Sequence, residues 1–264
     1  MGSRYCLTMI IMTQIRIFVM IQKIKALTLL GVAATLLSQS TIAKEQFEIT
    51  PYEARYSVVW RGMDVGESVH RFEALEDNKW RLASETEPHL GFLPYDYYES
   101  STFTIKGAQV VPLEYEYNKQ EGLKKKKGLL TFDYENKKVF NHDKDHPWET
   151  ELLPSMFDEL TQTLAMRQDL IEGKDNFTYH IVKDHKYRTY KFTVAGEEVL
   201  ETELGKIKTL KLEHKHPRRN RQTMFWVSPE YDYLLIKMSQ YRKGKLVGGG
   251  EIVGYEPLPT SEPS

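Results

Sequence analysis

Arg167 is the residue whose type and position point most directly to chemistry, because its spacing predicts a buried positive charge. It falls on the same helical stripe as the apolar residues Phe157, Leu160, Leu164 and Ile171. A guanidinium buried without a partner is very unfavourable, so Arg167 needs a partner or an exit to solvent. The alternatives are an anionic ligand held in a barrel mouth, a structural pair with a strand carboxylate, or a side chain that reaches water at the helix end.

Two basic clusters are further candidates for binding anions. The first is Lys124 to Lys127, and the second runs from His214 to Arg221. Both are expected at strand ends or hairpin turns, where such runs are commonly solvated and discourage edge-to-edge pairing of strands. The functional alternative is contact with anionic envelope material, such as lipid phosphates or acidic polysaccharide, with an affinity that falls steeply with salt.

Aromatic side chains are numerous, and most of them are expected in the core because aromatic residues favour strands. Two tryptophans nevertheless join the basic residues as candidates for lining a ligand pocket. The ligand-binding residues that the sequence predicts are Arg167, Trp60, Trp226, Arg218, Arg219 and Arg221. The apolar segment Leu90–Tyr95 is expected to cap one barrel end or to close over a cavity.

Signatures of catalysis are missing, so no catalytic residue is assigned and an enzyme is not the favoured interpretation. The sequence has no nucleophile elbow, no glycine-rich phosphate loop and no metalloprotease motif. Glu85, Glu87 and Asp96 would suit a hydrolase only if they met near an open barrel end. Asp158 resembles a catalytic carboxylate, but its place at a helix start predicts a capping role.

The histidines do not predict a metal site. His214 and His216 share one face of an expected strand, and His142 and His146 lie in a polar segment that predicts a loop. Zinc sites use three or four converging ligands, which neither pair supplies. We therefore expect no metal and no cofactor.

A β-sheet must position these side chains, because apolar and polar residues alternate along much of the chain. Tyr52 to Trp60 and Val111 to Tyr117 alternate in this way, and each predicts a strand with one buried face. Similar runs cover 177–181, 190–194 and 234–238, and turn residues separate the runs. The pattern predicts a mainly β fold: an antiparallel, partly open, barrel-like sheet with one short helix.

The short helix is expected where the apolar stripe of Arg167 lies. Pro154 and Ser155 precede the stripe, and Asp158 follows three residues after Ser155, as in a capping box. Gly173 is expected to end the helix. Elsewhere, Gly248 to Gly250 lie in a strand-like run and predict a bulge or a close approach of backbones.

The N-terminal region has the three-part organisation of a secretory signal peptide. A basic start at Met20–Lys25 precedes the apolar run Ala26–Leu37, and small residues end at Ala43, where cleavage is expected. Met12 and Met20 are alternative initiators. A retained anchor is the alternative to cleavage, although Ala26–Leu37 is shorter than the roughly 20 residues that span a bilayer.

Cleavage would define an exported, periplasmic protein. The regions would be an extension with signal peptide (1–43), a single β-rich domain (44–255) and a disordered, proline-rich tail (256–264). Cys6, the one cysteine, belongs to the leader, so the mature chain would have no disulfide. The formal net charge of −1 becomes more negative without the basic leader, which argues against nucleic acid as a partner.

Several segments resemble an exported bacterial family known as domain of unknown function 3108. The resemblance is carried by Asp158–Thr161 with Arg167, and by Phe225–Pro229 with Asp232–Leu234. The segment Tyr56–Gly66 is similar to the start of that family, and the resemblance covers roughly Tyr52 to Tyr255. It implies an antiparallel, partly opened barrel-like fold with a single helix, and it implies no activity.

Three functions are compatible with the sequence. The first is a non-enzymatic periplasmic module that binds an amphipathic or anionic cell-envelope molecule, or a protein partner. The second is a hydrolase acting on envelope polysaccharide or lipid, and the third is a scaffold or interaction protein without a small-molecule site. A deep apolar cavity would favour the first, two carboxylates about 5 to 10 Å apart in a cleft the second, and a filled core the third.

Overall fold

One large sheet dominates the protein. The computed structural model describes residues 50–88, 95–121, 124–144, 146–183, 187–216 and 220–259. The strands of the first half are β1 (Tyr52–Trp60), β2 (Met63–Ala74), β3 (Lys79–Pro88), β4 (Tyr95–Lys106), β5 (Gln109–Glu121), β6 (Lys124–Asp133), β7 (Lys138–Asn141) and β8 (Trp148–Glu151). The expectations for residues 1–49, for most of Leu90–Tyr95, for Arg218 and Arg219, and for residues 260–264 lie outside the described residues.

The second half adds seven strands and a helix to the same sheet. The strands are β9 (Met156–Phe157), β10 (Asn176–Val182), β11 (Tyr187–Thr202), β12 (Gly205–His216), β13 (Arg221–Ser228), β14 (Leu234–Arg242) and β15 (Lys245–Pro257). The helix α2 spans Thr161–Ile171, and a 3₁₀ turn, η1, spans Pro229–Tyr231. No helix in the described ranges is long and apolar enough to cross a membrane.

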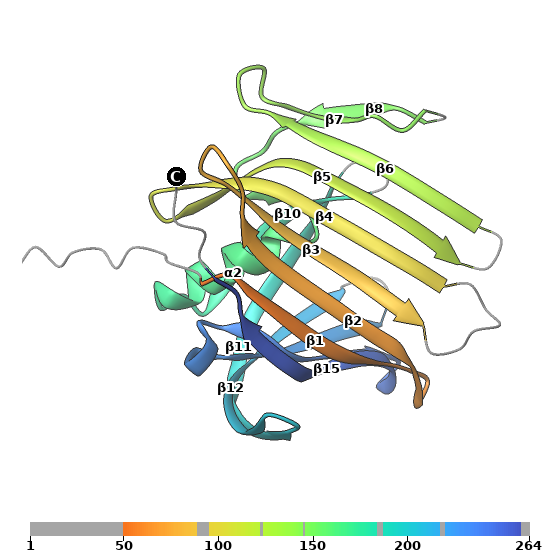
Figure 1. Cartoon of the computed structure of the whole chain (residues 1–264), viewed down its shortest axis with the longest axis vertical. Helices are drawn as coiled ribbons and strands as arrows, with labels where there is room; N and C mark the ends of the chain where they lie inside the picture. The colour runs from red at the N-terminus through yellow and green to blue at the C-terminus, as the bar shows by residue number, and fades with distance from the viewer. Residues whose placement is uncertain are drawn as a thin grey trace, which may run out of the picture. The chain divides into compact units, whose positions relative to one another are not determined.

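The strand order explains how the sheet curls. It runs β8-β7-β6-β5-β4-β3-β2-β1-β15-β14-β13-β12-β11-β10-β9, so β1 and β15 join the two halves and β8 and β9 are the edges. Only Leu152–Ser155 separates these edge strands along the chain, a span of at most about 17 Å. The edges must therefore lie near each other, and the sheet bends round without closing (Figure 1). This confirms the predicted antiparallel, partly open barrel-like fold, with β9 and β10 as a parallel pair.

The apolar core fills the concave side of the sheet. Phe72 of β2, Leu130 of β6 and Ile252 of β15 are fully buried in one cluster with Leu164 of α2. The helix contacts β5 and β10, so it lies on the inner face. Burial of one apolar face by each of these strands supplies the main stabilising free energy of such a fold.

The helix start differs from the prediction. Met156 and Phe157 pair with β10 as β9, and α2 begins at Thr161. Ser155 takes a left-handed backbone (φ +53°) and forms no capping box. Instead Asp158 and Thr161 cap the helix together: the Oδ1 of Asp158 accepts the backbone N–H groups of Leu160 and Thr161, both at 2.9 Å, and the hydroxyl of Thr161 accepts the backbone N–H of Asp158 at 3.2 Å. Gly173 ends the helix as predicted, with φ +77°.

A β-bulge changes the buried face within β5. The register between β4 and β5 shifts between Thr102 and Phe103, and the extra residue reverses the alternation. Val110 and Pro112 are buried before the bulge, and Tyr115 and Tyr117 after it. The prediction that Val111 and Leu113 share the face of Tyr115 was therefore wrong.

The prediction for Gly248 to Gly250 is confirmed as a close approach of backbones. A Cβ added at Gly249 would lie inside van der Waals contact of the Met238 carbonyl oxygen on β14. A Cβ at Gly248 would meet the indole ring of Trp60 on β1. Side chains are absent here because two neighbouring strands occupy the space.

Candidate anion-binding site

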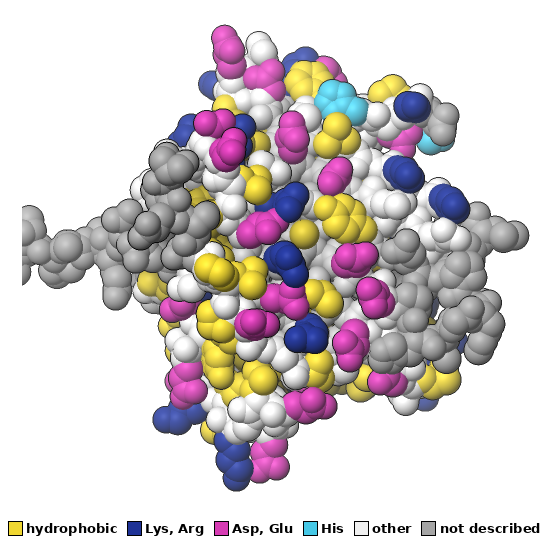
Figure 2. Space-filling model, viewed as in Figure 1, with side chains coloured by type: hydrophobic (Ala, Val, Ile, Leu, Met, Phe, Trp, Pro, Cys, Tyr) yellow, Lys and Arg dark blue, Asp and Glu magenta, His cyan; other side chains and the backbone are white. Residues whose placement is uncertain are grey.

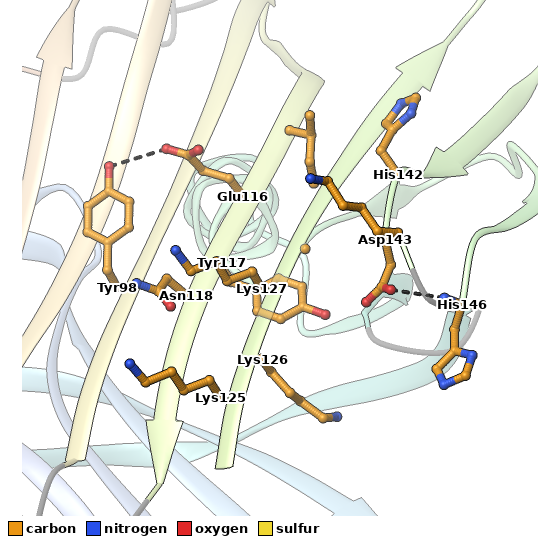
Figure 3. Close-up of a pocket in the computed structure, with 13 residues that line it drawn as sticks. Tyr98, Glu116, Tyr117, Asn118, Lys125, Lys126, Lys127, His142, Asp143 and His146 are labelled. Carbon is orange, nitrogen blue, oxygen red and sulfur yellow. Dashed lines mark hydrogen bonds between the residues drawn. The ribbon is translucent and has the colours of Figure 1, made fainter. Parts of the chain in front are cut away.

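A pocket of about 690 Å³ lies beside β6. It is lined by Tyr98, Glu116, Tyr117, Asn118, Lys125, Lys126, Lys127, Gly128, Leu129, His142, Asp143, Lys144 and His146. Strands β4, β5 and β6 and the segment after β7 contribute these residues (Figure 3). The pocket therefore combines a rigid floor of paired strands with a wall formed by one loop.

Strand register brings the outer floor together. Asn118 of β5 is paired with both Tyr98 of β4 and Lys127 of β6, so the three side chains share the outer face. Lys125 lies two residues before Lys127 and shares that face. Figure 3 shows Lys125 and Lys127 lying over β5, toward Tyr98, while Lys126 extends the other way.

Short side-chain contacts hold the loop wall in place. The amide oxygen of the buried Asn141 accepts the N–H of Asp143 at 2.8 Å, and the carboxylate of Asp143 accepts the N–H of His146 at 3.0 Å. These local bonds, typical of turns stabilised by Asn and Asp, fix the path of residues 142–146 where it is described. His142 is anchored to β6 by a 2.9 Å hydrogen bond between its Nε2 and the hydroxyl of Thr131.

The charges of the lining favour an anion. Four lysines line the pocket against two carboxylates, those of Glu116 and Asp143. Glu116 accepts a hydrogen bond from Tyr98 at 3.5 Å, and Asp143 accepts one from the backbone of His146. Lys125 and Lys127 form no ion pair with another described residue. Their ammonium groups are the donors that a phosphate or carboxylate would meet.

The rest of the outer face of the sheet carries charges of both signs. Figure 2 shows acidic and basic side chains interleaved over this face. Glu53 pairs with Arg71 and Glu73 pairs with Arg81 across neighbouring strands. A pocket in which cations outnumber anions is therefore distinct from the surface of mixed charge beside it.

A second polar cluster lies on the inner face, around Glu99 of β4. Its Oε2 accepts hydrogen bonds from Tyr97 at 2.8 Å and from Tyr115 at 2.6 Å. Burial and the neighbouring Glu159 raise the pKa of Glu99 to about 7, against the lowering effect of the tyrosine hydroxyls and Lys183. Lys183 forms an ion pair with Glu159. This group can exchange a proton near neutral pH.

Arg167 is buried as predicted, but its partners are backbone carbonyls. Its Nε donates to the carbonyl of Asp232 at 2.6 Å and its Nη2 to that of Tyr231 at 3.5 Å. The guanidinium carbon lies 5.8 Å from the ring centre of Tyr52, and Nη1 has no hydrogen-bond partner among the described residues. Arg167 therefore joins α2 to the turn at η1, and the structure describes no strand carboxylate paired with it.

The other predicted ligand-binding residues lie apart from Arg167. Trp60 is 47% exposed at the end of β1 and packs over Gly248. Trp226 is buried on β13, and its Nε1 donates to Glu198 at 2.8 Å. Arg221 is exposed at the start of β13, in register with His216 and Arg242. No described contact joins these residues to one another or to Arg167, and a shared ligand site for them stays a prediction.

The predicted hydrolase carboxylates lie away from any inner site. Glu85 and Glu87 are exposed on β3, and the side chain of Asp96 lies outside the described residues. Their register places them opposite Val69 and Glu67 of β2, on the outer face. Among the described residues no group of three or more His, Cys, Asp or Glu side chains is arranged to hold a metal. His214 is instead buried against Tyr190, with its ring centre 4.7 Å away.

Sequence reasoning named Lys124 to Lys127 as a candidate for binding anions, but it missed the other residues of that pocket and the cluster around Glu99. Lys124 to Lys127 was recognised as a basic run, but Tyr98 and Asn118 were not linked to it because only strand register joins them. The signal for Glu99 was present: it lies two residues after Tyr97 on the buried face of a strand, where a carboxylate is rare.

Comparison with known proteins gives a family but no activity. The family described as "Protein of unknown function (DUF3108)" matches residues 55–245, so the chain belongs to it, which confirms the resemblance. No curated protein matches. A beta-barrel-like protein of domain of unknown function DUF1849 from Brucella abortus is similar in structure, with a TM-score of 0.56, 9% identity, and coverage of 80% of this chain and 99% of that chain. A putative exported protein with YmcC-like fold from Bacteroides fragilis matches with a TM-score of 0.33, 10% identity, and coverage of 80% and 98%.

Proposed function

We propose that this DUF3108 protein is an exported binding module that holds an anionic group in the pocket beside β6. The observation that carries the proposal is a pocket of about 690 Å³ lined by four lysines, in which Lys125 and Lys127 have no described acidic partner. Pockets of this volume accommodate small ligands or the head of a larger one. The cell-envelope candidates are an anionic lipid, an acidic polysaccharide and a protein partner.

The apolar part of the lining supports an amphipathic ligand. Tyr98, Tyr117 and Leu129 present carbon surface next to the lysines. Lysine stems add further apolar area while their ammonium groups stay hydrated. A ligand with a charged group and an adjacent apolar part would use both.

Export remains part of the proposal and rests on the sequence from Met20 to Ala43. Expression of the full gene in a Gram-negative host, followed by mass spectrometry of the periplasmic fraction, tests it. A mature chain that begins at Lys44 would support export and cleavage. An uncleaved chain in the membrane fraction would contradict both.

Binding is tested with tripolyphosphate as the probe, by calorimetry at 20 mM and 200 mM salt. A double variant, Lys125→Gln with Lys127→Gln, is expected to weaken binding at least tenfold at the lower salt, because charge contributes most when screening is weak. The control variant is Lys208→Gln with Lys245→Gln, which removes two exposed lysines outside the pocket. Equal affinities for all three proteins, or an affinity independent of salt, would overturn the proposal.

A further inference from the structure

The first part of β6 has a strand on only one side. Residues 124–131 pair with β5, whereas β7 pairs only with residues 130–133. Figure 1 shows β7 and β8 diverging from the start of β6. In the described part of the chain, Lys124 to Gly128 therefore form an open strand edge, which is a template for a further strand.

The direction of the backbone groups along this edge follows from one hydrogen bond. The N–H of His142 donates to the carbonyl of Leu129 at 2.9 Å, so the peptide groups of Leu129 face the β7 side. In an antiparallel ladder, alternate residues point their N–H and C=O to the same side. The register between β5 and β6 has no shift, so Lys127 and Lys125 also present their N–H and C=O at the open edge.

The pocket surrounds this edge. Its lining includes Lys125 and Lys127 from the outer face, and Tyr117 and Gly128 from the inner face. Gly128 has no side chain because the ring of Tyr117 fills that space. An added strand places alternate side chains on the two faces of a sheet, and space on both faces is what it needs.

The positive charge of this edge favours an acidic partner strand. The consecutive lysines at 125, 126 and 127 place positive charge on both faces of the edge. Such an edge repels basic strands, and Lys125 and Lys127 have no described acidic partner that would compete with a carboxylate on an added strand. An extended segment rich in Glu or Asp would pair both its backbone and its side chains.

We propose that residues 124–128 of β6 take up an extended acidic segment of a partner protein as an added strand. The inference rests on the proposed anion binding, and it names the ligand as a polypeptide. Hydrogen bonds to the backbone of Lys125 and Lys127 hold the segment, and its carboxylates meet the lysines. The edge supplies the affinity, and the charge pattern supplies the specificity.

The test compares two fluorescent peptides on the purified protein from the full gene. One is an alternating Glu-Val hexapeptide, and the other is the same peptide with an N-methyl group at every residue, which blocks pairing along both of its edges. The unmodified peptide is expected to bind at least tenfold more tightly than the N-methylated peptide. Equal affinities would overturn strand addition, while binding of tripolyphosphate would show that the anion pocket itself stands.

Two substitutions of Lys127 distinguish the contribution of its backbone N–H to peptide binding from the contribution of its side chain. Lys127→Pro removes the lysine side chain and the edge-facing N–H without removing a hydrogen bond to β5, and Lys127→Ala removes the lysine side chain but keeps the N–H. The proline variant is expected to bind the unmodified peptide at least fivefold more weakly than the alanine variant, with equal binding of tripolyphosphate. Equal peptide binding by two folded variants would contradict the proposal, and the N-methylated peptide decides the question if the proline variant does not fold.

Vesicles of phosphatidylglycerol and phosphatidylcholine distinguish a lipid ligand. Salt-dependent binding to the anionic vesicles without peptide binding would overturn the inference and leave the proposed function intact. If the protein bound neither the peptide, nor tripolyphosphate, nor the anionic vesicles, both the inference and the proposed function would be overturned.

Discussion

The hydroxyl of Tyr115 donates a 2.6 Å hydrogen bond to the carboxyl of Glu99, which also accepts from Tyr97. Two donors on one oxygen stabilise the ionised carboxylate, yet burial and Glu159 outweigh them and raise the pKa from 4.5 to about 7. A raised pKa means that the folded chain binds this proton more tightly than the unfolded chain. The neutral carboxyl therefore stabilises the fold below pH 4.5, and this contribution is lost as the pH rises through 7.

Glu99→Gln should abolish this pH dependence. Between pH 5 and 8 the free energy of unfolding of the unmodified protein should fall by about 2 to 3 kcal/mol relative to the variant. Urea unfolding at pH 5, 6, 7 and 8 measures the difference. Glu114→Gln, on the exposed face of β5, is the matched control and should follow the unmodified protein. If the free energies of unfolding of Glu99→Gln and of the unmodified protein changed with pH in the same way, Glu99 would not be the group responsible for the pH dependence.

Substitution of Asp158, which caps α2, should lower the free energy of unfolding more than substitution at most other positions. Asp158 is fully buried and accepts four hydrogen bonds, including 2.8 Å from Ser101 on β4 and 2.7 Å from the hydroxyl of Thr161. Asp158→Ala should lower the free energy of unfolding by about 3 kcal/mol, because several buried donors lose their acceptor. Ser101→Ala should cost about 1 kcal/mol. A double-mutant cycle in urea should show coupling, and additive effects would mean that the bond contributes nothing.

Replacement of Arg167 tests whether it is structural. Arg167→Met leaves the carbonyl of Asp232 without its donor and should lower the free energy of unfolding by about 2 kcal/mol. Arg167→Lys should restore part of the loss, because an ammonium group can donate to one of the two carbonyls. Both variants should bind tripolyphosphate like the unmodified protein. A stable Arg167→Met protein that no longer binds the anion would reverse this assignment.

Glycines of β15 should differ in how much their replacement by alanine lowers the free energy of unfolding. Gly249→Ala forces a methyl group against the backbone of Met238 and should cost about 3 kcal/mol, because neither strand can move alone. Gly254→Ala meets only Arg55 side-chain atoms, the nearest at 3.5 Å, and should change stability by less than about 0.5 kcal/mol. Thermal unfolding compares the two variants. Equal effects would show that β14 and β15 adjust to the extra carbon.

The strands were predictable because their signal is local. Alternation marked β1 over its full length, and it marked the middle of β5 and β10 and the first half of β11 and β14. The class of fold followed from the number and spacing of these runs. The position of the helix also followed from its apolar stripe, but its first residue did not, because β10 recruits Met156 and Phe157 into a parallel pair.

The candidate site depends on information that is not local. Tyr98, Asn118 and Lys127 lie on three strands, and only the register aligns them. The partners of Arg167 are backbone carbonyls of a turn more than sixty residues away, which no pattern of side chains can reveal. Sequence periodicity therefore predicted which residues are buried better than it predicted which of them meet.

The pairing of β1 with β15 sets an order for folding. Tyr52 lies opposite Pro257, so the β1–β15 pair brings together the two ends of the described chain. Each hairpin of the sheet, in contrast, pairs strands that are neighbours in the sequence. Loop closure makes such a distant contact slower to form than local hairpins. In a nascent chain, β1 to β8 can pair with one another before β15 has been synthesised. Until then, the side of β1 that pairs with β15 has no partner strand. A chain that stops before β15 would present that unpaired side to other molecules, which makes the final strand a safeguard against aggregation.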